Sequence, residues 1–332
     1  MDFGFTDEQQ AIKETAREML AARSPLSKVR EAAESRTPDD ALWKQICDLG
    51  WPGIAIPEEH GGQGLGMVEL AILCEELGYA CAAVPFLSDA TAALFVSVAG
   101  SDEQRDRWLP PLASGEQRGA SAFEPGEGNL VLDPAGADLL VLAEGRDGAR
   151  LVEASDASIE EVNLIDATRG HGRVTASGGD SLPGDAEAAA DRAVVALAAE
   201  LTGVAQRAME MAVEYAKERE QFDRPIGAYQ AVSHRCAGML YDTEEARSLT
   251  LYAAWCADAE PESLPLAASM AKARASDAAW HVTADALQVL GGIGFTWEHD
   301  LQFLLKRAKV GAELLGDPRL HRERVATLAG LG

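Results

Sequence analysis

The sequence predicts a mostly helical protein with a small β-rich module in its middle, and two observations carry this prediction. Over most of the chain, apolar residues recur at spacings of three and four, which is the period of an amphipathic helix. Between residues 116 and 185 this period gives way to short apolar runs separated by Gly, Asp and Pro, a pattern typical of strands and turns. We therefore expect an N-terminal helical domain (1–115), a reduced middle β domain (116–185) and a C-terminal four-helix bundle (186–332).

The N-terminal domain is predicted to be a series of helices. One helix is expected from 6 to 34, where Thr6 and Gln9 form a capping-box pattern and apolar residues follow at helical spacing. A second helix starts after Pro38. A connector rich in Gly and Pro (50–66) follows, and further helices are expected at 67–79, 86–99 and 102–113.

Two apolar runs in the middle domain are the clearest strand candidates, at 139–145 and 149–154. After residue 186 the helical period returns and persists to the end of the chain. Ala193, Leu197 and Leu201 begin an apolar stripe on the first of these helices. Long helices with short breaks favour a bundle, and they are expected at 187–218, 229–258, 263–290 and about 298–315.

The composition limits the classes of function. The chain has 332 residues, of which 47% are hydrophobic, and this is enough for a large core. Its 54 acidic and 29 basic residues give a formal net charge of −25. Nucleic acids and anionic membranes require concentrated positive charge, so neither is expected as a partner.

Cysteine and histidine usage indicates a reducing compartment and no metal. The five cysteines contain no C-x-x-C pair and are expected to be small core residues. The six histidines lack the spacing of a metal site. The first residues show neither a basic segment nor a long apolar run, so no signal peptide is predicted and we expect a cytoplasmic protein.

The stretch YAKEREQFDRPIGAYQ (215–230) gathers basic residues in this acidic chain. Arg219 and Phe222 are three residues apart at the end of a predicted helix, so their side chains share a face. A guanidinium beside an aromatic ring suits a diphosphate next to a flat heterocycle. The alternative is a solvated helix end, where cations are common, with Phe222 packed into the core.

A second stretch, QVLGGIGF, ends the third helix of the predicted bundle. Gln288 offers an amide, and Gly291 and Gly292 permit close approach of a ligand or of another backbone. The alternative is an ordinary helix that ends at glycine. A further glycine-rich stretch, GGQGLG (61–66), lacks the spacing and the strand–turn–helix context of a dinucleotide-binding loop, so we interpret it as a tight connector.

Several long motifs, in order, resemble the acyl-CoA dehydrogenase family of flavoproteins over nearly the whole chain. The family's N-terminal domain is resembled by LWKQICDLGWPGIAIPEEHGGQGLG, ELAILCEELGYACAAVPF and SDEQRDRWLPPLASGE. The T-E-P-x-x-G-S-D segment that opens its β domain is resembled by FEPGEGN (123–129). The two signature stretches of its bundle are resembled by YAKEREQFDRPIGAYQAVSHRCAGML and QVLGGIGFTWEHDLQFLLKRA.

This resemblance implies FAD as the cofactor, bound across a subunit interface. In the family, one subunit's β domain holds the flavin ring, and its neighbour's bundle holds the pyrophosphate and adenine end. Carried over to this chain, the residues of that grip are Arg219, Phe222, Gln288, Gly291 and Gly292. Asp223 departs from the pattern because the family usually has glycine there, and a carboxylate near phosphates costs free energy unless it points away.

The resemblance also implies α,β-dehydrogenation of an acyl-CoA thioester. In that reaction a glutamate removes the α-proton while hydride leaves the β-carbon for the flavin. Most members carry the glutamate in a Y-E-G segment, which aligns with Leu315 and Gly316. Other members carry it near the start of the first bundle helix, which aligns with Ala193. Neither Leu315 nor Ala193 can accept a proton.

The middle domain departs from the family as well. Tens of residues of strand and turn normally pack on the flavin ring, whereas Leu130 to Asp138 fill that interval here. Some bacterial members pair a full-length chain with a shorter one, often in the breakdown of sterol side chains. This chain resembles such a short subunit, which supplies the adenine-end grip to a flavin whose ring and base lie in the full-length partner of an α2β2 complex.

Two alternatives stay open. The first is that the chain is a self-sufficient enzyme with a displaced base. Glu200 is the leading candidate for that base because it lies in an apolar helical run. A buried carboxylate there either has a raised pKa or is paired. Glu313 is a weaker candidate, two residues from the usual position. The second alternative is that the chain is a non-catalytic scaffold of the same fold. A steroid-derived acyl-CoA substrate and an electron-transfer flavoprotein as acceptor are expectations from the resemblance alone.

Overall fold

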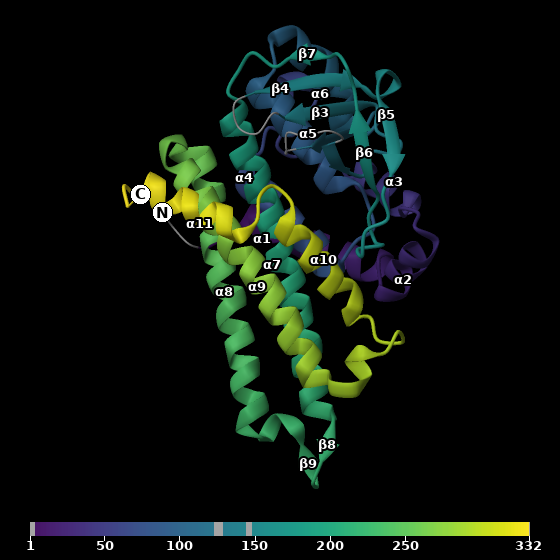
Figure 1. The fold of residues 1–332 in the computed structure, drawn as a ribbon, viewed down its shortest axis with the longest axis vertical. Coiled ribbons are helices and arrows are strands. Elements are labelled where there is room, and N and C mark those ends of the chain that lie inside the picture. The colour runs from purple at the N-terminus through teal and green to yellow at the C-terminus, as the bar shows by residue number, and fades with distance from the viewer. Residues whose placement is uncertain (1–3, 123–128, 144–147, 332) are drawn as a thin grey trace.

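The computed structural model describes residues 4–122, 129–143 and 148–331. A small β module and the N-terminal helices lie at one end of the molecule, and a long helical bundle projects from them to the other end (Figure 1). This arrangement confirms the mostly helical fold with a small β domain and a C-terminal bundle. Within the described residues, all five cysteines are free, and no helix has both the length and the apolarity needed to cross a membrane.

The N-terminal helices begin with the predicted capping box, in which the Gln9 amide donates to Thr6 Oγ1 at 3.2 Å and the Gln9 side chain accepts from Thr6 N at 3.0 Å. The single helix predicted from 6 to 34 is wrong, because the chain leaves helical geometry at Ser24 and a new helix starts after Pro25. Proline disfavours helical geometry in the residue before it, which explains the break. The helices are α1 (Asp7–Arg23), α2 (Leu26–Ser35), α3 (Asp40–Asp48), α4 (Met67–Ala80), α5 (Phe86–Ala99) and α6 (Asp102–Ser114).

The β module consists of two small sheets. One has the strand order β1-β3-β4-β7, with β1 and β3 parallel and the other pairs antiparallel, and the second has the antiparallel order β2-β6-β5. The interval 130–138, predicted only as a connection, contains most of β2. The strands are β1 (Gly119–Ala122), β2 (Asn129–Leu132), β3 (Leu139–Ala143), β4 (Ala149–Glu153), β5 (Ser158–Glu161), β6 (His171–Thr175) and β7 (Asp180–Ser181).

Strand β3 is buried on both faces because it separates two layers of the core. Leu140 and Leu142 belong to the core between the two sheets, together with Val131 and Val174. Leu139, Val141 and Ala143 alternate with them and belong to a second core with α5 and α6. This period of two is the pleat of a strand that is covered on each side.

The bundle is built around α7 (Ala186–Glu218), a 33-residue helix. It contacts α8 (Gln230–Ala259), α9 (Leu264–Leu290) and α10 (Leu301–Glu313), and it also packs on α4 and α5. Gly78 in α4 and Gly203 in α7 each lie against the other helix's backbone so closely that a Cβ atom would clash. A further helix, α11 (Pro318–Leu328), packs across α9 and was not predicted.

Candidate functional site

The basic stretch after α7 forms a tight hairpin at the far end of the bundle (Figure 1). Strands β8 (Glu220–Gln221) and β9 (Arg224–Pro225) are antiparallel. The two residues between them, Phe222 and Asp223, have φ values of 54° and 62°. Positive φ at both central residues is the geometry of a type I′ hairpin turn, which favours Gly, Asn and Asp. Asp223 therefore satisfies the backbone requirement of the position where the family usually has glycine.

The hairpin presents Phe222 to solvent, where it is 87% exposed, so the alternative that placed it in the core is wrong. Its ring meets the Tyr229 ring edge-on, with 6.5 Å between centroids. The Tyr229 hydroxyl donates to Gln221 O at 3.0 Å, and the Arg224 guanidinium lies 3.9 Å from the Tyr229 ring centre. These contacts fix the hairpin and leave Phe222 available to stack on a flat ligand.

Arg219 follows α7 directly, as its C-cap residue, and is exposed. Its backbone N–H donates to Tyr215 O at 2.8 Å, but its guanidinium has neither a hydrogen bond nor an ion pair within the described residues. In a chain with a net charge of −25, an uncommitted guanidinium is available to an external anion such as a pyrophosphate.

The second predicted stretch lies where α9 ends in the short 3-10 helix η6 (Gly291–Phe295). Gln288 is exposed in the last turn of α9. Gly291 has a φ of 61°, a conformation that favours glycine, and a Cβ at Gly291 or Gly292 would meet nothing within 4 Å. Packing inside this chain therefore does not require glycine at Gly292, whereas close approach by a ligand would.

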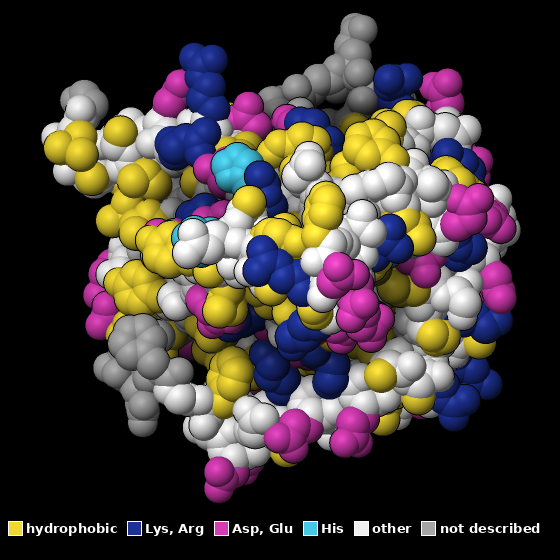
Figure 2. Space-filling view, turned by 90° about the horizontal axis from the view of Figure 1, so that it is seen from below, with side chains coloured by type: hydrophobic (Ala, Val, Ile, Leu, Met, Phe, Trp, Pro, Cys, Tyr) yellow, Lys and Arg dark blue, Asp and Glu magenta, His cyan; other side chains and the backbone are white. Residues whose placement is uncertain are grey.

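Both stretches lie at the same end of the bundle, remote from the β module (Figure 1). Figure 2 looks at this end and shows Lys and Arg side chains gathered among hydrophobic ones. Exposed aromatic residues contribute to this end of the fold, including Phe222 at 87%, Phe295 at 81% and Trp297 at 57% exposure. The combination of cations, exposed rings and open glycines fits the pyrophosphate and adenine end of FAD.

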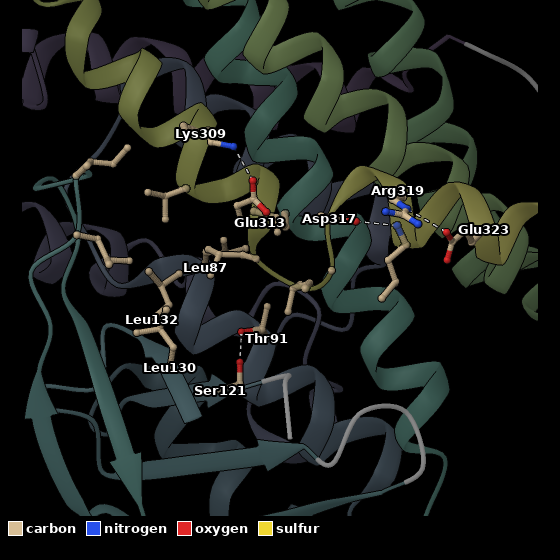
Figure 3. Close-up of a pocket in the computed structure, with 18 residues that line it drawn as sticks. Leu87, Thr91, Ser121, Leu130, Leu132, Lys309, Glu313, Asp317, Arg319 and Glu323 are labelled. Carbon is tan, nitrogen blue, oxygen red and sulfur yellow. Dashed lines mark hydrogen bonds and ion pairs between the residues drawn. The ribbon is translucent and has the colours of Figure 1, made fainter. Parts of the chain in front are cut away.

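A cavity of about 770 Å³ lies elsewhere, between the β module, α10 and α11 (Figure 3). This volume is in the range of pockets that hold small organic ligands. On the side of the β module, the Thr91 and Ser121 hydroxyls hydrogen-bond to each other at 2.7 Å. Most of the lining is apolar and comes from Leu87, Leu130, Leu132, Leu164, Ile165, Leu197, Val310, Leu314, Leu315 and Leu320.

The carboxylates that line the cavity are already engaged. Glu313 pairs with Lys309 at 2.6 Å, and Glu323 pairs with Arg319 at 3.2 Å. Asp317 caps α11 by accepting from Leu320 N at 2.7 Å. A general base must be free to take a proton from its substrate. None of these three carboxylates is uncommitted.

The two positions that align with the family's base differ in their surroundings. Leu315 lines the cavity, so the position that usually carries the base does face this space, with an apolar side chain. Ala193 is fully buried in the core under α5 and α6. Neither position offers a proton acceptor.

Glu200, the leading candidate for a displaced base, lies in a buried ion-pair cluster, which is the paired arrangement that the sequence also allowed. Its Oε1 atom contacts the guanidinium of Arg169 and lies 3.3 Å from that of Arg307. It is 4% exposed and does not line the 770 Å³ cavity. A carboxylate held by two arginines is stabilised in its charged form and is a poor proton acceptor.

The rest of the cluster supports this structural role. Asp166 lies 3.4 Å from Arg307 Nε. Burial raises the pKa of Asp166, but Arg307 and Arg169 outweigh burial and hold its pKa below the ordinary value. Burial also lowers the pKa of Arg169 to about 10, which still leaves it charged at neutral pH. The cluster therefore ties α7 and α10 to the segment before β6 through ionised groups.

Sequence reasoning missed the cavity wall and the cluster partners. Arg169 and Arg307 lie far apart in the sequence, and no local pattern connects them to Glu200. The predicted FEPGEGN motif lies almost entirely outside the described residues, since 123–128 are not among them.

Fold and sequence together define the class of the protein. The family model described as the acyl-CoA dehydrogenase N-terminal domain matches residues 6–116, and the one described as the C-terminal domain matches residues 186–329. The chain belongs to the acyl-CoA dehydrogenase family, and the resemblance seen in its motifs is confirmed.

Several individual members of the family are similar to this chain over nearly its whole length. The acyl-CoA dehydrogenase IpdE2 of Mycolicibacterium smegmatis is 34% identical over 322 residues, which cover 96% of this chain and 98% of IpdE2. A variant of the Tcur3481–Tcur3483 steroid ACAD has a solved chain that is 29% identical, with a TM-score of 0.87 and 98% of each chain covered. A chain of the ChsE4–ChsE5 complex from Mycobacterium tuberculosis is 26% identical, with a TM-score of 0.87 and 100% of each chain covered.

Proposed function

We propose that this chain is one subunit of a heteromeric, FAD-dependent acyl-CoA dehydrogenase of the α2β2 type. It contributes the pyrophosphate and adenine grip to a flavin whose ring and catalytic base belong to a full-length partner chain. The observation that carries the proposal is an exposed cofactor grip in a chain whose base position is apolar. The cofactor-type residues are exposed and uncommitted at the end of the bundle, while the chain's own cavity presents Leu315 at the position of the base.

The residues at the end of the bundle would hold FAD in distinct ways. Arg219 would pair with the pyrophosphate, and Phe222 would stack beside the adenine end. Gln288 would donate its amide, while Gly291 and Gly292 would let the cofactor approach the backbone. FAD, when bound, supplies the hydride acceptor of the dehydrogenation.

The relatives support the heteromeric arrangement and suggest a substrate class. Two of the solved relatives are named as pairs of proteins, the ChsE4–ChsE5 complex and the Tcur3481–Tcur3483 steroid ACAD. We propose that the substrate is an acyl-CoA thioester with a steroid-derived acyl group, and that electrons pass to an electron-transfer flavoprotein. Because none of the described carboxylates that line this chain's cavity is uncommitted, the α-proton would go to the partner's base.

The test is the flavin content and the mass in solution of the chain alone and of the chain co-expressed with its nearest encoded full-length relative. We expect one FAD per pair of unlike chains and little flavin on the isolated chain. One FAD per chain in a stable homo-oligomer would overturn the proposal in favour of a self-sufficient enzyme. A partnered complex without flavin would support a non-catalytic scaffold instead.

Two variants sharpen this test. Arg219→Ala removes one charge-assisted interaction and is expected to lower the FAD affinity of the complex by about 10- to 100-fold. Arg173→Ala is the matched control, since Arg173 is also exposed but pairs with Glu160 in the β module. Equal loss of flavin in both variants would show that Arg219 has no specific role.

A further inference from the structure

Lys272 is a lysine buried inside the bundle, in α9, with 0% exposure. Its ammonium donates to Ser276 Oγ at 2.9 Å, to Ala312 O at 2.9 Å and to Gly316 O at 3.0 Å. These three oxygen acceptors use all three N–H groups of an ammonium. No described carboxylate lies within ion-pair distance of it, and an ammonium buried in this way costs several kcal/mol unless its contacts compensate.

Two of the three acceptors lie outside α9, where α10 passes into α11. Ala312 is in the last turn of α10, whose carbonyls have no partner within the helix. Gly316 is in the connection to α11, which we call the α10–α11 turn (residues 314–317). A cation at a helix C-terminus is also favoured by the helix dipole. Lys272 therefore binds the end of α10 and the turn at the same time.

The α10–α11 turn has a backbone that needs external support. Leu315 has a φ of 59° and Gly316 a φ of 92°. The left-handed conformation is unfavourable for a leucine, because its Cβ approaches the following carbonyl oxygen. The structure holds the turn from a second side as well, since the buried His321 ring contacts Leu315 O through Nε2 at 2.8 Å.

This turn forms one wall of the 770 Å³ cavity, with all four of its residues in the lining. Lys272 itself does not line the cavity. We propose that Lys272 is a positioning residue, which fixes the α10–α11 turn through Ala312 O and Gly316 O and so sets the shape of the cavity wall that carries Leu315. This inference goes beyond the proposed function and does not depend on flavin or on the identity of the substrate.

The proposal differs from a purely structural role for Lys272. If the lysine only stabilised the core, its replacement would lower the free energy of unfolding and leave the local order of the turn unchanged in the folded state. If it positions the turn, the turn loosens in the folded protein and the cavity loses affinity for an apolar ligand. The two roles are separated by local rather than global measurements.

The experiment compares Lys272→Met with Ser276→Ala in the full chain purified on its own. Methionine keeps much of the apolar volume but donates no hydrogen bond, whereas Ser276→Ala removes the acceptor on α9 and leaves both contacts to the turn in place. Hydrogen–deuterium exchange read by mass spectrometry reports the amides of residues 313–322 separately from the rest of the chain. Binding of cis-parinaric acid, a fluorescent apolar probe, reports the cavity.

In Lys272→Met we expect exchange in 313–322 to rise about tenfold or more and affinity for cis-parinaric acid to fall by at least about threefold, with other segments unchanged. Ser276→Ala should stay within about twofold of the unmodified chain. Unchanged exchange at the turn, or a loosened turn with unchanged probe affinity, would overturn the proposal. Should Lys272→Met fail to fold, His321→Leu releases the turn from the other side and must produce the same two changes.

Because the readouts need no flavin and no turnover, their failure is distinguishable from failure of the proposed function. Variants that show no response at the turn would remove the role of Lys272 and leave the proposed function standing, because FAD binding by the complex is measured separately.

Discussion

The interpretation of Glu200 depends on partners that the sequence does not reveal. In the sequence it is a lone carboxylate in an apolar helical run, which is compatible either with a base of raised pKa or with a paired charge. In the structure its partners come from two remote segments, Arg169 before β6 and Arg307 in α10. The pairing makes it a structural residue, because removing one member of a buried ion-pair cluster leaves uncompensated charge.

Glu200→Gln is therefore expected to destabilise the fold, by about 3–5 kcal/mol in the free energy of unfolding, as is typical of a broken buried pair. Urea unfolding monitored by circular dichroism measures this loss. Glu313→Gln is the control: its exposed pair with Lys309 should contribute less than about 1 kcal/mol. Full stability of Glu200→Gln together with lost turnover in the complex would instead identify Glu200 as a base.

Lys272 gives a prediction with a defined pH dependence. Burial lowers its pKa from 10.5 to about 7, while the nearby charges of Glu313, Asp317 and Asp277 oppose the shift. Below about pH 7 the lysine is protonated in both the folded and the unfolded chain, so it adds no pH dependence. Between pH 7 and 10.5 the unfolded chain binds more protons, so this group makes the free energy of unfolding rise with pH.

The measurement is the difference in unfolding free energy between the unmodified chain and Lys272→Met at pH 6, 7, 8 and 9. That difference should be flat up to pH 7 and then shift in favour of the unmodified chain by up to about 1.4 kcal/mol per pH unit. Ser276→Ala, which keeps the lysine, should follow the unmodified chain. A difference that stays flat through pH 9 would show that the lysine keeps an ordinary pKa.

At the scale of elements, the sequence predicts long periodic helices well and everything held by distant contacts poorly. α7, α8 and α9 begin and end within one residue of their predicted bounds, because each buries residues at spacings of three and four, in α8 from Met239 onward. The break at Pro25 was missed since the apolar period continues across it, and α11 was missed since it has only one buried residue, His321. Short strands such as β5, which is mostly exposed, carry no alternation strong enough to predict them.

In the candidate site, too, local motifs could be predicted from the sequence, whereas features that depend on distant contacts could not. Arg219, Phe222, Gln288 and the two glycines lie in contiguous motifs, so the sequence could nominate them as a set. The exposure of Phe222 could not be predicted, because it follows from a hairpin whose turn residues both have positive φ. The cavity wall and the cluster around Glu200 join segments more than 30 residues apart, as the contact of Glu200 with Arg169 shows, and only the folded chain reveals them.

At the tip of the β8–β9 hairpin, the effect of the Asp223 backbone conformation on FAD binding can be separated from the effect of its carboxylate. Asp223 has a φ of 62° at the tip, beside the residues proposed to hold a pyrophosphate. If its carboxylate repels phosphate, Asp223→Asn and Asp223→Gly should both tighten FAD binding by the complex, by about two- to tenfold. If only the backbone matters, Asp223→Gly alone should have an effect. FAD titration of the apo-complex, followed by flavin fluorescence, measures both variants, and weaker binding in both would contradict a carboxylate that opposes the cofactor.

At the scale of the whole molecule, the fold places the two proposed parts of a flavin site far apart within one chain. The proposed cofactor grip is at the far end of the bundle, while the cavity that presents Leu315 lies beside the β module (Figures 1 and 3). A chain arranged in this way has an exposed surface that is useful only when another chain supplies the remaining cofactor contacts. Its stability should therefore depend on partner and flavin together.

Thermal unfolding tests this dependence. A ligand that binds only the folded state stabilises it by about 2.7 kcal/mol at 100 times its dissociation constant, so FAD should raise the melting temperature of the complex by several degrees. On this proposal the isolated chain has only the adenine-end grip, so FAD at the same concentration should leave its melting temperature unchanged. Arg219→Ala should reduce the shift in the complex, while Arg173→Ala should preserve it. An equal shift for the isolated chain would mean that copies of this chain complete the flavin site without an unlike partner, and the heteromeric proposal would fail.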